Sequence, residues 1–334
     1  MLSFSEIPPR AGNKKPEYCF NTEVQSKLKD FKTYLQELGN GSNTIRQKSN
    51  YAGYFLKWLE TEHLQIESTR YNDLLNFIDY CKLEGKSKKH INSKLRSIRN
   101  FYEYLKTQNP KIINPAANLN LKGTHKKVIS GIIDFNELKN LYQSFETNGN
   151  RGKRNKIILG LLIYQGITTE ELKQLEPNHL KLKEGKIYIP GNRRRNGRNL
   201  ELKPFQILEL HEYITEIRPK ILNEITAPRP TRKPANINKT RIENQLFISI
   251  NGSEHIKNSL LHLFRDIKKI NPSITNAKQI RQSAITHWLK NYNLRQVQYM
   301  AGHKYVSSTE RYQANNLEGL QTRLEKYHPL RRNY

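Results

Sequence analysis

The sequence contains no apolar run of about 18 residues, the length that a membrane-spanning helix needs. Its first 15 residues lack the basic start and the apolar core of a secretory signal. Cysteine is scarce as well: Cys19 and Cys81 are the only two in 334 residues, so neither a disulfide framework nor a cysteine-based metal cluster is expected. We therefore expect a cytoplasmic protein with no membrane segment, no metal and no cofactor.

Acidic residues are also few. Asp and Glu total 30 against 57 Lys and Arg, which gives a net charge of +27. Such an excess attracts polyanions and makes nucleic acid the leading partner. Ribosomal-type binding and membrane-surface binding are the alternatives. A protein of this kind would be found in the cytoplasm, and with the nucleoid when bound to DNA.

The first half of the chain has a helical pattern. Proline and glycine among charges predict a loose arm over residues 1–17. Over residues 18–108 apolar side chains recur at steps of three and four, which predicts four amphipathic helices. Glycines near 39–41 and at 85 separate these helices, and Ser87 can cap the fourth. Residues 109–130 lack a sustained apolar period and predict a basic linker.

The second half, residues 131–334, predicts a mixed domain with a C-terminal tail. Most of it has a helical bias, but residues 186–189 and 199–202 indicate two short strands around a basic hairpin loop. Residues 246–249 indicate a third short strand. The fold class is therefore mainly α with a small antiparallel β-hairpin or sheet, arranged as two domains.

Four residues near the end of the chain combine chemistry suited to a phosphodiester. Lys278 and Arg281 lie three apart on a predicted helix, so we expect both side chains to face the same way. Arginine stays protonated and can hold a phosphate with two parallel hydrogen bonds. His303 follows Gly302 and can act as an acid or base near neutrality. Tyr312 can attack a phosphate if cations stabilise the charge that develops.

Each of these residues taken singly is more often structural than catalytic, because the chain has 18 tyrosines and 10 histidines. The joint spacing is far more specific. Residues 278–289 resemble the His-x-x-Arg box of the tyrosine recombinase family, with lysine where histidine is usual. Residues 299–303 resemble its Leu-Gly-His box, and residues 309–312 resemble its Thr-x-x-Tyr segment.

The likeness extends to the first half, where residues 42–45, 97–105 and 114–115 resemble the core-binding domain of phage-type integrases. It implies a two-domain clamp around duplex DNA, with an N-terminal four-helix core-binding domain and a tyrosine-recombinase catalytic domain. Tyr312 would form a 3′-phosphotyrosine link, Arg281 would hold the phosphate, and His303 would assist. Lys278 would donate to the same oxygen.

Two positions depart from the family pattern. Thr168 stands where the family has its first arginine, and Asn192 stands where it has a hairpin lysine. Losing one donor to a developing oxyanion costs roughly 3–4 kcal/mol, or about 10²–10³ in rate, which slows an enzyme without abolishing it. The residues that could supply the missing charge are Arg193, Arg194, Arg195 and Lys173.

Basic residues cluster in three places, and phosphate contacts of this kind give affinity without sequence information. The predicted DNA contacts are Lys86, Lys88, Lys89, Lys94, Arg96 and Arg99 at the fourth helix, Lys122, Lys126 and Lys127 in the linker, and Arg198 in the hairpin loop. Asn43, Thr44 and Asn92 are polar residues near helix starts that could reach bases.

The leading functional hypothesis is a site-specific recombinase of a mobile element, an integrase or transposase, working as a homotetramer on two DNA sites. Residues 317–327 form an amphipathic segment that would pack either on a neighbouring protomer or on its own domain. The alternatives are a DNA-binding accessory protein with weakened or lost catalysis, and a DNA breaking-rejoining enzyme of the topoisomerase or hairpin-resolving type.

Overall fold

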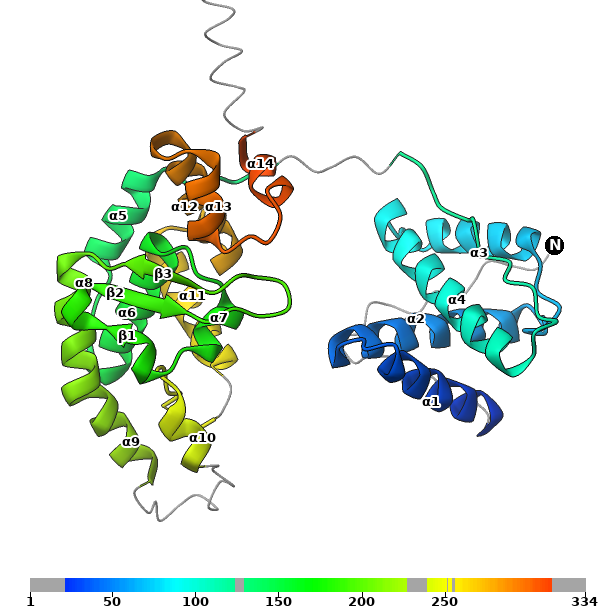
Figure 1. Cartoon of the computed structure of the whole chain (residues 1–334), viewed down its shortest axis with the longest axis horizontal. Helices are drawn as coiled ribbons and strands as arrows, with labels where there is room; N and C mark the ends of the chain where they lie inside the picture. Colours follow the sequence, from blue (N-terminus) through cyan, green and yellow to red (C-terminus); the bar gives the residue numbers. More distant parts are fainter. Residues whose placement is uncertain (1–21, 124–128, 227–238, 251, 254–255, 314–334) are drawn as a thin grey trace, which may run out of the picture. The chain divides into compact units, whose positions relative to one another are not determined.

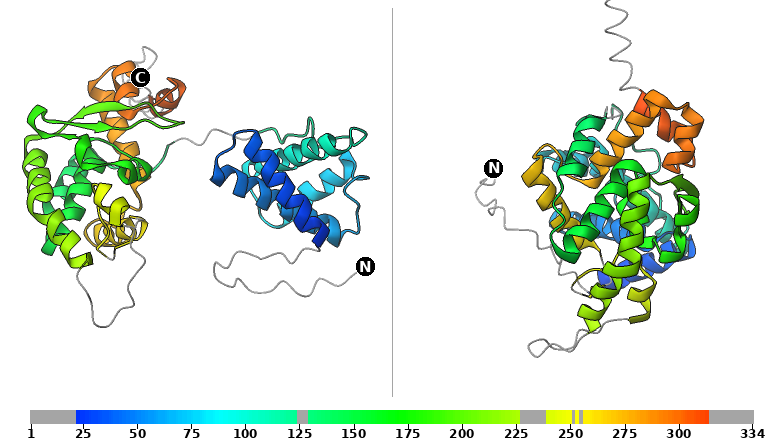
Figure 2. Two further views of the ribbon diagram at one scale, coloured as in Figure 1. Left: turned by 60° about the horizontal axis from the view of Figure 1, so that its bottom comes forward. Right: turned by 90° about the vertical axis from the view of Figure 1, so that its left-hand side faces the viewer.

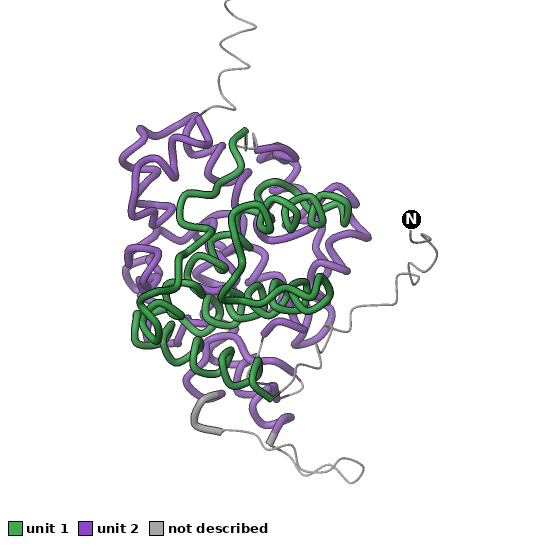
Figure 3. Tube along the Cα trace, turned by 90° about the vertical axis from the view of Figure 1, so that its right-hand side faces the viewer, with its two compact units in different colours: residues 1–126 green, residues 127–334 purple. Residues whose placement is uncertain are grey.

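A computed structural model describes residues 22–123, 129–226, 239–250, 252–253 and 256–313. The chain divides into two compact units, Met1–Lys126 and Lys127–Tyr334 (Figure 3). The predicted arm, residues 1–17, and the amphipathic segment 317–327 lie outside the described residues. Within the described part, no helix combines the length and the apolarity that crossing a membrane requires.

Unit 1 is helical throughout its described secondary structure, as the sequence predicts (Figure 1). Its helices are α1 (Thr22–Glu37), α2 (Ser42–Thr61), α3 (Tyr71–Leu83) and α4 (Lys88–Gln108). Aromatic rings from all four helices meet in the core, where Phe31 packs on Phe101 and Phe55 packs on Phe77. Ser87 caps α4 by accepting a hydrogen bond from the backbone N–H of His90.

Lys94 does not lie on the surface, and its prediction as a DNA contact is wrong. Only 2% of the residue is exposed, and its Nζ lies 3.6 Å from Cys81 Sγ and 3.1 Å from the centre of the Tyr54 ring. Burial lowers the pKa of Lys94 and raises that of Cys81. The ammonium group is therefore held by a cation–π contact in the interior.

Unit 2 combines helices with one small sheet. Its helices are α5 (Phe135–Ser144), α6 (Gly149–Tyr164), α7 (Thr169–Gln174), α8 (Pro204–Glu212), α9 (Arg218–Thr226), α10 (Lys239–Asn244), α11 (Lys257–Ile270), α12 (Ala277–Asn291), α13 (Leu294–Ala301) and α14 (Ser307–Gln313). A π-helical turn, Tyr213–Ile217, joins α8 to α9. Helix α6 runs through the main core, with Leu159, Leu161 and Leu162 completely buried.

The sheet is antiparallel with the order β1 (Leu180–Lys181), β2 (Lys186–Ile189) and β3 (Arg198–Glu201). Ile187 pairs with Leu200, and both face the core. The third strand is thus β1, and the predicted strand at residues 246–249 is wrong. That segment is buried but does not pair with a strand. Leu246 N–H donates to Leu175 O at 2.8 Å, and Arg154 donates to Ile248 O at 2.6 Å.

Helices α12, α13 and α14 form a group that lies against the β2–β3 hairpin (Figure 2). A small apolar cluster holds this group together, with Ala284, Ile285 and Trp288 from α12 and Val297 and Ala301 from α13. The ring of Tyr312 packs on the same cluster. This packing fixes the positions of α12 and α14 relative to each other, and with them the side chains described next.

Candidate active site

Arg281 is at the centre of the site. Its helix, α12, is capped by Asn276, whose side chain accepts a hydrogen bond from the N–H of Gln279. One turn later the guanidinium of Arg281 points into the protein, with 5% of the residue exposed. It donates to Gly166 O and, at 2.6 Å, to Ala301 O, and it lies 3.3 Å from His303 Nε2. Arg281 thereby ties α12 to the ends of α6 and α13.

His303 follows the sharp end of α13. Gly302 takes a left-handed conformation (φ +66°) and ends the helix. The chain then turns so that His303 Nδ1 lies 2.9 Å from the hydroxyl of Thr309, a fully buried residue on α14. The rings of His303 and Tyr312 are nearly parallel, with centres 6.1 Å apart. The structure therefore brings Arg281, His303 and Tyr312 together from three segments.

A buried carboxylate, Glu171, organises the positive charge around Arg281. Thr168 caps α7 in a capping box: its N–H and its hydroxyl both donate to Glu171 Oε2, at 2.8 and 2.9 Å. The side chain of Glu171 has no exposed surface. Arg198 donates to Oε1 at 2.8 Å, and Arg281 Nη1 lies 3.8 Å from Oε2. Thr168 thus orients the carboxylate toward the arginines.

Arg198 belongs to this internal network, so its prediction as a DNA contact is wrong. Its side chain has no exposed surface, and it bonds to Glu171 and, at 2.7 Å, to Met300 O. Its Nη2 is buried without a hydrogen-bond partner among the described residues. Arg198 therefore connects β3 to α7 and α13 instead of facing solvent.

The hairpin loop after β2 reaches the same place through its backbone. Asn192 and Arg195 pair with each other at 2.9 and 3.2 Å, which tightens the loop. Asn196 N–H donates to Gly302 O at 3.1 Å, and Arg195 forms an isolated β-bridge with His303. Nη1 of Arg195 lies 3.4 Å from Glu171 Oε2, and 28% of the side chain is exposed.

These contacts set the charge of the carboxylate and of the buried arginine. Burial alone would raise the pKa of Glu171, but the bond from Arg198, the nearby charge of Arg281 and the backbone N–H of Thr168 lower it to about 2. Burial lowers the pKa of Arg281 to about 10, and the charge of Arg195 acts in the same direction. Both groups are therefore ionised at pH 7.

The same surroundings keep His303 neutral. Burial, and then the positive charges of Arg281, Arg195 and Arg198, lower its pKa to about 4. At pH 7 the imidazole can accept a proton. An entering phosphate would offset the neighbouring positive charges and raise this pKa, which suits a group that takes up a proton only when substrate is bound.

Comparisons with known proteins agree with this arrangement. The phage integrase family model matches residues 132–318, more than half of the chain. The chain belongs to the phage integrase family. The N-terminal SAM-like domain of phage integrases matches residues 28–109. The chain is thus a tyrosine recombinase, a site-specific enzyme that breaks and rejoins DNA.

Relatives agree with this membership, and solved structures share the fold. The chain is 26% identical over 278 residues to the tyrosine recombinase XerC of Staphylococcus carnosus, covering 81% of this chain and 86% of the relative. It is 25% identical over 309 residues to XerD of Listeria innocua, covering 90% and 98%. The fold resembles that of XerH site-specific recombinase bound to a palindromic difH substrate, with a TM-score of 0.67, 18% identity and coverage of 91% and 89%. It also resembles the Tn1549 transposon integrase in complex with a circular intermediate DNA, with a TM-score of 0.61, 18% identity and coverage of 86% and 94%.

Several residues predicted for this integrase-family site do not contact the cluster around Arg281. Lys278 is exposed and has no polar partner among the described residues, whereas Arg281 is buried, so the two do not face the same way. Lys173 is exposed and pairs with Glu170 at 2.8 Å. Arg193 and Arg194 form the exposed tip of the hairpin, and the side chain of Asn192 accepts a hydrogen bond from the backbone of Arg194.

Glu171 and Thr309 were missed by sequence reasoning. The spacing Thr168-x-x-Glu171 is the signature of a capping box, and it predicts that the glutamate folds back onto its helix start. It does not predict that three arginines would lie within 4.0 Å of the same carboxylate. Thr309 is the threonine of the Thr-x-x-Tyr segment, but that segment does not predict its contact with the His303 ring, which follows from the turn after Gly302.

Apart from the buried Lys94, the residues predicted to contact DNA in unit 1 differ in exposure and in their partners. Those that are exposed are Lys86, Lys88, Lys89, Arg96 and Lys122. Arg99 and Asn92 instead bind backbone of the same chain: Arg99 donates to Ala116 O and Leu119 O, and Asn92 exchanges two hydrogen bonds with Leu121. Asn43 is exposed and Thr44 half-buried, while Lys126 and Lys127 lie outside the described residues.

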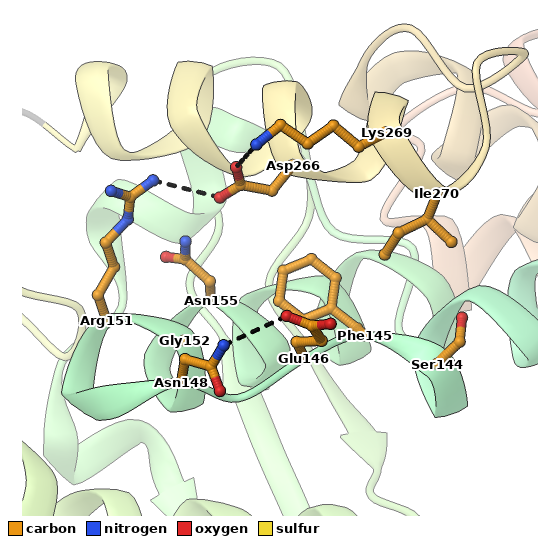
Figure 4. A pocket seen from close by; sticks show the side chains of 10 residues that line it. All are labelled: Ser144, Phe145, Glu146, Asn148, Arg151, Gly152, Asn155, Asp266, Lys269 and Ile270. Carbon is orange, nitrogen blue, oxygen red and sulfur yellow. Dashed lines mark hydrogen bonds and ion pairs between the residues drawn. The ribbon is translucent and has the colours of Figure 1, made fainter.

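A separate pocket of about 420 Å³ opens between the α5–α6 connection and α11 (Figure 4). Its polar groups largely satisfy one another: Asp266 pairs with Arg151 at 3.2 Å, and Glu146 accepts from Asn148 at 3.2 Å. None of the predicted catalytic residues lines it. In the part of the chain that the structure describes, no group of three His, Cys, Asp or Glu residues is arranged to hold a metal.

Proposed function

We propose that Tyr312 is the nucleophile of this recombinase. Its phenolic oxygen would lose its proton and attack the scissile phosphorus, and the bond from phosphorus to the 5′ oxygen would break. The leaving 5′ oxygen would take up a proton, so that a 3′-phosphotyrosine link and a free 5′-hydroxyl result with no net change in protons. The reverse attack by a 5′-hydroxyl would rejoin DNA. The observation that supports this proposal is the convergence of Tyr312, His303 and Arg281 on one another.

The surrounding groups have complementary roles in this proposal. Arg281 would bind a nonbridging phosphate oxygen and stabilise the negative charge that grows during attack. Neutral His303, fixed by Thr309, would accept the phenolic proton or hydrogen-bond the phosphate. Lys278 on the exposed side of α12 would add a mobile cation from the solvent side. Arg281 Nη1 lies 3.8 Å from Glu171 Oε2, so the two charges stabilise each other.

A nicked suicide substrate, which loses a short strand after cleavage, tests this assignment. Wild-type protein should accumulate a covalent protein–DNA adduct on a denaturing gel, and Tyr312→Phe should form none. Tyr305→Phe is the matched control, because Tyr305 lies in the preceding turn and is largely exposed. An adduct of normal yield with Tyr312→Phe would refute the proposal.

The natural substrate in this proposal is duplex DNA at two sites, bound by a homotetramer, and the enzyme serves a mobile element. A solved lambda integrase tetramer bound to a Holliday junction is a structural neighbour with a TM-score of 0.60. The Tn1549 integrase neighbour supports the mobile-element assignment. The accessory-protein and topoisomerase-like alternatives are not favoured by the comparisons.

Light scattering of Tyr312→Phe bound to paired DNA sites tests the oligomeric state. It should give the mass of four protomers, and a mass of one or two would contradict the tetramer.

A further inference from the structure

Three guanidinium groups surround a single carboxylate in this site. Arg195, Arg198 and Arg281 all lie within 4.0 Å of Glu171, which carries one negative charge. The cluster therefore keeps an excess of positive charge inside a largely buried region. Buried positive charge of this kind raises the free energy of the folded protein unless a bound anion neutralises it.

The three arginines differ in how many of their N–H groups remain free to bind an anion. Arg198 has no exposed surface and bonds to Glu171 and Met300. Arg281 is nearly buried and already donates to two backbone carbonyls. Arg195 has 28% of its side chain exposed, and among the described residues its one polar side-chain partner is Glu171, at 3.4 Å. Its remaining N–H groups are therefore open to a ligand.

The backbone fixes Arg195 beside the reacting groups. Asn196 bonds to Gly302, and Arg195 is bridged to His303, so the start of the Arg195 side chain lies next to the histidine. The positive charge of Arg195 also lowers the pKa of both Arg281 and His303, in agreement with this closeness. Arg195 thus approaches the phosphate position from the hairpin, whereas Arg281 approaches it from α12.

We infer that Arg195 is a second phosphate-binding arginine, which grips the scissile phosphodiester together with Arg281. Glu171 is the positioning residue that holds both guanidiniums, and Thr168 orients Glu171 instead of contacting phosphate. The inference rests on the proposed role of Tyr312. Among the basic residues that could supply the missing charge, the geometry favours Arg195. Arg194 lies at the exposed tip of the hairpin, and Lys173 is paired with Glu170.

Single-turnover cleavage of the suicide substrate at saturating DNA tests this role. Arg195→Ala should slow adduct formation by about 10²–10³-fold, as expected for loss of one donor to a developing oxyanion. Arg194→Ala is the matched control, because it removes the same charge one residue away, and its rate should stay close to that of the wild type. Arg195→Lys should fall between the two, because lysine keeps the charge but loses the paired hydrogen bonds.

A substrate with a neutral methylphosphonate at the scissile position separates phosphate binding from a structural role. If Arg195 neutralises the phosphate, the defect of Arg195→Ala should shrink at least about tenfold on this substrate, since part of the charge it stabilises is gone. An equal defect on both substrates would overturn the inference, as would wild-type cleavage by Arg195→Ala. Either result leaves the proposed function standing as long as Tyr312→Phe forms no adduct.

Discussion

At the scale of single residues, the most consequential group is one that takes no part in bond making. Glu171 accepts hydrogen bonds from Thr168 and Arg198 and lies close to Arg195 and Arg281. A buried carboxylate is stable only when donors satisfy it, and here the donors are themselves charges that need a counterion. The carboxylate and the arginines therefore depend on one another.

Glu171→Gln should destabilise unit 2 by about 3 kcal/mol, because it leaves buried guanidinium groups without their counterion. Glu170→Gln is the matched control, since Glu170 is the exposed neighbour and its pair with Lys173 contributes at most about 1 kcal/mol. Urea unfolding of the two variants measures the difference. Equal losses would show that Glu171 does not hold the cluster.

The same carboxylate makes stability depend on pH in a stated direction. The folded pKa of Glu171 is about 2, below its ordinary value of 4.5. Its stabilising contribution is therefore fully present above pH 4.5 and is lost as the pH falls from there toward 2. Wild-type protein should lose stability more steeply than Glu171→Gln over this range in an acid-unfolding series.

At the scale of elements, the join between the hairpin and α13 decides whether the site is assembled. Gly302 has a left-handed conformation, and a Cβ there would lie 2.5 Å from Arg198 Nη1 and 3.1 Å from Asn196 O. The glycine therefore serves two needs at once. It ends α13, and it lets Arg198 and the hairpin loop approach the turn before His303.

Gly302→Ala should destabilise unit 2 and reduce cleavage together. Gly39→Ala is the matched control, because Gly39 has a nearly identical φ of +67° but nothing lies within 4 Å of its added Cβ. The control should cost about 1 kcal/mol for the left-handed conformation alone. Urea unfolding and the suicide-substrate assay should show a larger loss for Gly302→Ala, and equal stability losses would contradict the close approach.

The elements also show what could be predicted from the sequence and what could not. The helices of unit 1 follow from apolar periodicity and from caps such as Ser87, because both signals are local. Residues 246–249 are apolar enough for a strand, yet they are buried through bonds to α6 and to Leu175. A short apolar run predicts that the segment is buried, but it does not predict which groups will hydrogen-bond to its backbone N–H and C=O.

The candidate active site could also be predicted in part. Tyr312, His303 and Arg281 could be named from their local motifs, and the structure brings them together. The burial of Lys94 and Arg198 could not be predicted, because a basic residue has no sequence signal that separates an internal partner from solvent. Arg198 and Glu171 are 27 residues apart, so their pairing depends on the fold.

At the scale of the whole molecule, each unit has its own core. The apolar cluster of unit 1 is built from residues 28–119 and that of unit 2 from residues 133–280. The sequence predicts a core-binding domain at 18–108, a linker at 109–130 and a catalytic domain at 131–334. Ile112, Ala116 and Leu119 of that linker are buried in the core of unit 1, so we propose that the core-binding domain continues through residue 119. With a net charge of +27, DNA binding by the whole chain should weaken steeply as salt rises.

Residues 1–126 should fold alone, because their core is complete. Far-UV circular dichroism should show a helical spectrum and a cooperative thermal transition for this fragment. A fragment of residues 1–95 is the control, since it lacks Phe101, Tyr102 and Leu105, which are buried in that core. A fragment 1–126 that melts without cooperativity would mean that unit 1 needs the rest of the chain.

The hairpin and the turn of His303 are joined through the main chain, by Asn196 N–H and Gly302 O. A main-chain bond does not depend on which side chains the loop carries. During evolution an arginine could therefore be relocated along this loop, or transferred to it from α7, while the frame around the phosphate stays intact. Recombinases with an incomplete signature should accordingly be judged by where their cations lie in space and not by where they fall in a motif.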